Sequence, residues 1–130
     1  MKLRMLLAAI AVLALSGAAE AQTWALKAPI AAKPAFLTTV GQSADIEMVK
    51  VVLDRSAVPY TANAQAKAGD LAASGAKTLV VVLGGSTKGL GAAGISADAE
   101  IDRARAVLAE AKNLGMTVIG VHVGGEARRG

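Results

Sequence analysis

The sequence of 130 residues has no cysteine, a single histidine, and only one each of tryptophan, tyrosine and phenylalanine. Without cysteine the chain cannot form a disulfide, use a thiol as a nucleophile or hold a metal through sulfur. One histidine excludes a histidine-rich metal centre, and the sequence predicts no metal site. The formal net charge is only +4. No basic stripe alternates with aromatic side chains, so the pattern typical of nucleic-acid binding is missing.

The first 21 residues have the pattern of a secretory signal peptide. Lys2 and Arg4 give a positive start, an apolar run follows over residues 5–15, and residues 19–21 form an A-x-A cleavage site before Gln22. The alternative is a membrane anchor, but a spanning helix takes about 20 apolar residues, and this run is shorter. We therefore expect export to the periplasm or the outside of the cell. The cleaved chain would have no membrane segment, and without cysteine it cannot carry a lipid on an N-terminal cysteine.

The stretch from Thr78 to Gly94, TLVVVLGGSTKGLGAAG, combines two patterns. Residues 79–83 are a continuous apolar run, which predicts a strand buried on both faces, as in a parallel sheet. Five glycines follow, at positions 84, 85, 89, 91 and 94. Glycine allows the backbone to take positive φ and to approach a ligand closely. A binding site is therefore expected at the carboxyl end of this strand.

Further strands and helices alternate along the chain. After an extended lead-in over residues 22–34, strands are predicted over 35–40, 58–61 and 117–123. Helices are predicted from Ser43 onward, within 62–74, and from Ser96 or Asp98 to about Leu114. This alternation predicts an α/β domain over residues 35–130 with an open parallel sheet. Right-handed crossovers, and a second strand confined to an edge by Pro59, predict the Rossmann- or flavodoxin-like order 2-1-3-4.

Helical spacing predicts which apolar side chains the two longer helices bury. The first helix would bury Ile46, Val49, Val52 and Leu53. The last helix would bury Ile101, Ala104, Val107, Leu108, Ala111 and Leu114. Met48 and Val51 lie off the first stripe, and they mark either a second buried face or ordinary exposed apolar residues.

The sequence places a candidate site where the strand order reverses, between the first and third strands. Ligands of such sheets bind beyond the carboxyl ends of the strands at this point. The flanking loops, residues 41–45 and 84–89, are polar and contain glycine, and their backbone N–H groups and Lys88 favour an anion. The candidate ligand-binding residues, two of them at or beyond the end of the last strand, are Gln42, Ser43, Gly84, Gly85, Ser86, Thr87, Lys88, His122 and Glu126. The alternative is that these loops are ordinary turns with helix-capping residues.

No motif assigns a reaction or a cofactor. Residues 89–94 match G-x-G-x-x-G, but they start six residues after the strand, and the next strand ends in VHV without an acidic residue. This context favours a chance match. The serines at 43 and 86 lack a G-x-S-x-G elbow. His122 could act as a general base near Glu126, or it could be a strand-end histidine bonded to a neighbouring loop.

Three stretches carry a family resemblance: VGQSADIEMVKVVLD, TLVVVLGGSTKGLGAAGI and VIGVHVGGEARRG. They resemble those of an uncharacterised family of exported bacterial α/β proteins, over roughly residues 34–130. The family has no activity that could be transferred to this chain. The resemblance implies that GQS, GGSTKGLGAAG and HVGGEARRG belong to one constellation, and that relatives continue past GGEARRG.

Three hypotheses for function follow. The first is an exported domain that binds a small polar or anionic ligand, the second an enzyme that uses His122, and the third a structural or partner-binding module. The oligomeric state is left open. We also expect an incomplete domain, because the strand over 117–123 is apolar on both faces and the chain stops at Gly130 before an element that would cover it. Its residues should therefore be more exposed than their types suggest.

Mass spectrometry of the protein recovered from its producing cells tests the signal peptide. Because the A-x-A site ends at residue 21, we expect a chain that starts with Gln22. An intact Met1 on a membrane-retained product would contradict cleavage.

Overall fold

The computed structural model describes residues 26–126, so the predicted signal segment lies outside them. In this described part of the chain, four strands and four helices form an α/β arrangement, with one helix after each of β1 and β2 and two helices between β3 and β4. In chain order they are β1 (Ala35–Val40), α2 (Ile46–Arg55), β2 (Tyr60–Ala62), α3 (Ala68–Ser74), β3 (Thr78–Leu83), α4 (Thr87–Ala93), α5 (Ala97–Asn113) and β4 (Thr117–Val121).

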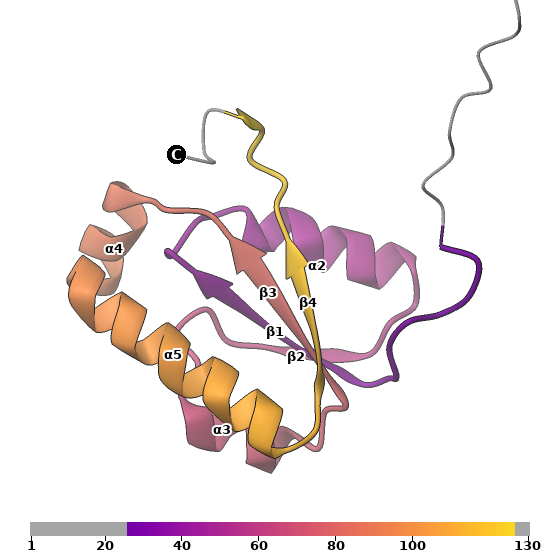
Figure 1. Ribbon diagram of the computed structural model, residues 1–130. Helices are drawn as coiled ribbons and strands as arrows, with labels where there is room; N and C mark the ends of the chain where they lie inside the picture. The colour runs from indigo at the N-terminus through magenta and orange to yellow at the C-terminus, as the bar shows by residue number, and fades with distance from the viewer. Residues whose placement is uncertain (1–25, 127–130) are drawn as a thin grey trace, which may run out of the picture.

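The strands form one parallel sheet in the order β2-β1-β3-β4 (Figure 1), which confirms the order predicted from the sequence. β1 and β3 pair over their whole length, from Ala35 opposite Thr78 to Val40 opposite Leu83. Both strands therefore end at the same level. The loops that follow them leave the sheet side by side, where the order reverses.

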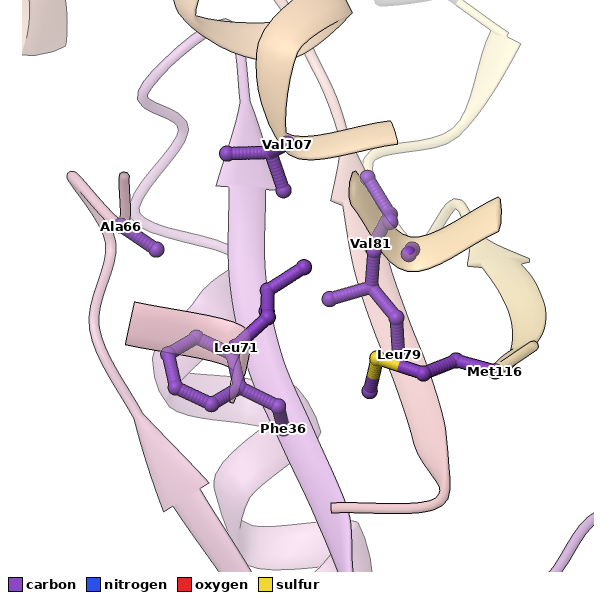
Figure 2. Close-up of a cluster of buried hydrophobic side chains, with 8 residues drawn as sticks. Phe36, Ala66, Leu71, Leu79, Val81, Val107 and Met116 are labelled. Atoms are coloured by element: carbon purple, nitrogen blue, oxygen red, sulfur yellow. The ribbon is translucent and has the colours of Figure 1, made fainter. Parts of the chain in front are cut away.

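Two apolar clusters hold helices on opposite faces of the sheet (Figure 1). On one face, Ile46 and Val49 of α2 pack against alternate residues of β1 and β3. On the other, α3 and α5 cover the cluster shown in Figure 2, in which Phe36, Leu71 and Val107 are each no more than 2% exposed. Right-handed crossovers put α2 on one side and the helices flanking β3 on the other. Both faces of β1 and β3 are covered as a result.

β4 is less well covered than β3, as its sequence predicts. Val118 is 45% exposed, and Ile119 and Val121 are half-buried. All three would be expected inside a parallel sheet. The reason is topological, since β4 is an edge strand and α2 packs against β1 and β3.

Some predicted helix faces are wrong. Val52 is 55% exposed and Ile101 is 47% exposed, whereas both were expected in the core. Leu108 and Leu114 are also exposed, and α5 turns Ala104, Val107 and Ala111 toward the sheet. Met48 and Val51 are exposed, in agreement with the reading that they are ordinary surface residues.

Several boundaries also differ from the prediction. α2 begins at Ile46, later than the predicted start after Ser43, whereas α3 lies within the predicted range of residues 62–74. The stretch after β3 was predicted as a loop, but residues 87–93 form α4 despite Gly89 and Gly91. Ser86 caps this helix by accepting a hydrogen bond from the Gly89 N–H. None of the helices within residues 26–126 has the length and apolarity needed to cross a membrane.

Candidate functional site

The loops after β1 and β3 are joined by backbone hydrogen bonds. The Gly84 N–H donates to Val40 O at 3.0 Å, and the Ser86 N–H donates to Gly41 O at 2.9 Å. Gln42 and Gly85 form an isolated antiparallel bridge. The two loops that the sequence singled out therefore form one unit at the reversal of strand order.

Two glycines allow this close approach. Gly41 has a φ of 98°, and a Cβ at this position would collide with the carbonyl group of Gly84. Gly89, on α4, faces the carbonyl oxygen of Gln42 so closely that a Cβ would overlap it. α4 can therefore rest on the loop after β1 only because position 89 has no side chain.

A buried carboxylate holds the loop after β1 in place. Glu100, in the first turn of α5, is 3% exposed. Its Oε1 accepts hydrogen bonds from the Gly41 N–H at 2.8 Å and from Gln42 Nε2 at 3.2 Å. Gln42 has a φ of 56°, a left-handed conformation that is uncommon outside glycine. The contacts of its side chain stabilise this conformation.

Arg103 neutralises the carboxylate. Its Nε lies 2.7 Å from Glu100 Oε2, and its Nη2 lies 2.8 Å from Oε1. The guanidinium also donates to the carbonyl oxygens of Thr39 and Ala66. The pair therefore joins the end of β1, the segment before α3 and the first turns of α5.

The pKa of Glu100 reflects these contacts. Burial raises the pKa, but the hydrogen bonds from Arg103, Gly41 and Gln42 outweigh it and hold the pKa below its ordinary value of 4.5. Glu100 is thus ionised at neutral pH. A charged acceptor strengthens the hydrogen bond from the Gly41 N–H.

A cleft of about 480 Å³ opens beside the joined loops. It lies between the loop that leads into α2, the segment after β2, and α4. Its lining residues are Gln42, Ser43, Ala44, Ile46, Ala64, Gln65, Ser86, Lys88, Gly89, Ala92 and Ala93. Lys88 is the only charged residue among them, so the cleft offers one cation and otherwise amides, hydroxyls and small apolar groups.

Four of the predicted site residues line this cleft: Gln42, Ser43, Ser86 and Lys88. The hydroxyl groups also have local partners. Ser43 Oγ accepts a hydrogen bond from the Asp45 N–H at 3.2 Å, and Ser86 Oγ accepts one from the Gly89 N–H at 2.9 Å. Gly84, Gly85 and Thr87 are not lining residues. The two glycines join the loops, and Thr87 begins α4.

His122 and Glu126 do not line the cleft. The ring nitrogens of His122 lie 3.0 Å from Leu83 O and 2.8 Å from Gly125 O, so the imidazole links the end of β3 to the turn after β4. Glu126 is exposed at the end of the described residues. Within residues 26–126, no group of three or more carboxylate or imidazole side chains is placed to hold a metal ion.

The predicted site residues did not include the other seven lining residues of the cleft, or Glu100 and Arg103. Ala64 and Gln65 line the cleft from the segment after β2, and nothing in their types marks them. Glu100 and Arg103 carry the buried ion pair. Glu100 precedes Ala104, Val107 and Ala111 by four, seven and eleven residues, which is the spacing of a single helix face. An acidic residue in register with that buried stripe was the available signal.

A family model described as "Domain of unknown function (DUF6305)" matches residues 32–130. The chain belongs to this family. The match covers all four strands and all four helices of the DUF6305 chain, and it agrees with the resemblance to a family that has no assigned activity. No match was found among curated proteins or solved structures.

Paired glycine substitutions in α4 test the close approach of this helix to the loop after β1. Gly89→Ala should lower the free energy of unfolding by about 2–3 kcal/mol, because its Cβ would overlap Gln42 O. Gly91→Ala is the matched control in the same helix. A Cβ at position 91 meets nothing within 4 Å, so this change should stabilise by about 0.5–1 kcal/mol through helix propensity. Urea unfolding measures the stability of both variants. Equal changes in the free energy of unfolding would contradict the close packing of Gly89 against Gln42.

Glu100→Gln tests the buried ion pair. Removing the charge leaves the largely buried guanidinium of Arg103 without an anionic partner, which should lower the free energy of unfolding in urea by about 3 kcal/mol at neutral pH. The matched control is Asp102→Asn, since the pair of Asp102 with Arg105 is exposed at 3.5 Å and should contribute less than about 1 kcal/mol.

The effect of Glu100→Gln on stability should depend on pH. Because the folded-state pKa of Glu100 is depressed, its stabilisation is present above the unfolded-state value and is lost as the pH falls through the folded-state value. The stability difference between the wild type and Glu100→Gln should therefore shrink toward acidic pH. A difference that is constant with pH would show that the effect of Glu100 is not electrostatic.

Proposed function

We propose that this DUF6305 chain is an exported domain that binds a small polar or anionic ligand in the cleft beside α4. The observation that carries the proposal is the position of the cleft. It lies at the reversal of strand order and is lined by both loops that join there. Open α/β sheets bind their ligands at this point, and the volume falls within the range of small-molecule sites.

The charge of the cleft favours an anion. Lys88 is exposed, and it forms no salt bridge within residues 26–126. An ammonium group at the mouth of a cleft with no acidic lining residue attracts negative charge. The GQS and GGSTKG stretches would then be the parts of the family motif that contact the ligand.

The other hypotheses have less support. An enzyme that uses His122 would need this residue near the cleft, but both ring nitrogens lie against backbone carbonyl oxygens outside it. Export is part of the proposal and rests on the signal-peptide pattern of residues 1–21. The third hypothesis, a structural or partner-binding module, would be favoured if no ligand binds.

An amide NMR titration with phosphate, citrate and acetate as probes tests the site. We expect shifts at residues 42–46 and 86–93, and Lys88→Ala should weaken anion binding by roughly tenfold, because it removes a charge a few ångströms from the ligand. Lys112→Ala is the control, since Lys112 is also exposed but lies in the last turn of α5. Equal weakening by both variants, or none by Lys88→Ala, would remove Lys88 from the site.

A further inference from the structure

The walls of the cleft are mainly apolar. Among the lining residues, the apolar side chains come from three separate segments. These are Ala44 and Ile46 from the loop into α2 and its first residue, Ala64 from the segment after β2, and Ala92 and Ala93 from the end of α4. Alanines at these positions leave room for a ligand, whereas larger side chains would fill the cleft. A ligand that occupies it must therefore place apolar groups against these walls.

The polar lining groups are largely engaged within the protein. Gln42 Nε2 donates to Ala64 O at 3.0 Å and to Glu100, and the hydroxyl group of Ser86 accepts from a backbone N–H. The Ser43 hydroxyl accepts from the Asp45 N–H. A ligand with many hydroxyl groups would meet few open partners, because these groups are already used to shape the loops. The exceptions are the ammonium group of Lys88 and the exposed side-chain amide of Gln65.

The structure also argues against a phosphate cradle for a nucleotide. Gly89 and Gly91 lie inside α4 and not between β3 and the start of a helix, which is where the dinucleotide fingerprint places its glycines. Gly89 serves the packing of α4 against Gln42. With Lys88 as the single charged lining residue, the cleft fits one negative charge better than several.

We infer that the ligand is an amphiphilic monoanion: a small carboxylate whose charged end lies at Lys88 and whose short aliphatic body packs against Ala44, Ala64, Ala92 and Ala93. This inference rests on the proposed binding function and names its ligand class. The ammonium group selects the charge, and the apolar wall supplies affinity in proportion to the methylene groups it removes from water.

A homologous series of linear carboxylates tests the inference. Acetate, butanoate, hexanoate and octanoate are titrated into the purified protein at constant pH and ionic strength, followed by amide NMR. The dissociation constant should fall by up to about fourfold for each added methylene, which corresponds to about 0.8 kcal/mol, until the cleft is full. Hexanoate should bind roughly tenfold tighter than hexanol, and Lys88→Ala should abolish that difference.

Ala92→Gln tests the apolar wall separately from the charge. Ala92 is exposed on α4, so the fold should tolerate the change. The variant should weaken hexanoate several-fold and acetate little, because only the longer body reaches the wall. Ala106→Gln is the control at an exposed alanine of α5 away from the cleft, and it should leave both affinities unchanged.

The outcomes distinguish failure of the inferred ligand class from failure of the proposed binding site. Lys88-dependent binding of acetate and phosphate, without any gain along the series, would overturn the amphiphilic ligand and leave the proposed function standing. An Ala92→Gln variant with unchanged hexanoate affinity would also overturn it. Failure of every probe to bind at millimolar concentration would overturn both proposals.

Discussion

The site depends on one buried charge, the carboxylate of Glu100. A carboxylate is costly to remove from water unless it is paired and hydrogen-bonded, and here Arg103, the Gly41 N–H and Gln42 Nε2 all donate to it. Since these donors belong to α5 and to the loop after β1, neither element can shift without breaking a charged hydrogen bond in the interior. The part of the loop after β1 that lines the cleft is consequently held in place without a ligand.

Two glycines near this point, Gly41 and Gly89, have packing roles. A Cβ at position 41 would collide with the carbonyl group of Gly84, and a Cβ at position 89 would overlap the carbonyl oxygen of Gln42 and push α4 away from it. A glycine-rich stretch after a buried strand resembles a phosphate-binding loop in sequence, yet here it continues into a short helix. The same residues bring Lys88 to the mouth of the cleft, which links the packing of α4 to the proposed choice of ligand.

The strands and their order could be predicted because they depend on strong local signals. β-branched runs mark β1 and β3, and right-handed crossovers leave few topologies. On α5, Ala104, Val107 and Ala111 were correctly predicted as buried, but Ile101, Leu108 and Leu114 are exposed. Alanine contributes little to a hydrophobic pattern, so the larger apolar residues shifted the predicted face, and Glu100 occupies a buried position instead. α4 was missed because two glycines lower helix propensity, and contact with the loop after β1 overrides that preference. The strand order indicates where a cleft should lie. Its apolar lining could not be predicted, since these residues come from segments far apart in the sequence.

Hydrogen exchange at the Gly41 amide tests the central claim most directly, because this N–H donates to the Glu100 carboxylate. We expect this amide to exchange as slowly as the amides of β1 and β3 in the wild type, because opening the loop requires breaking the hydrogen bonds to the buried carboxylate. In Glu100→Gln it should exchange much faster, while the β3 amides keep their relative protection. If the Gly41 amide of the wild type exchanges at the rate of an exposed loop, Glu100 does not hold this loop in place.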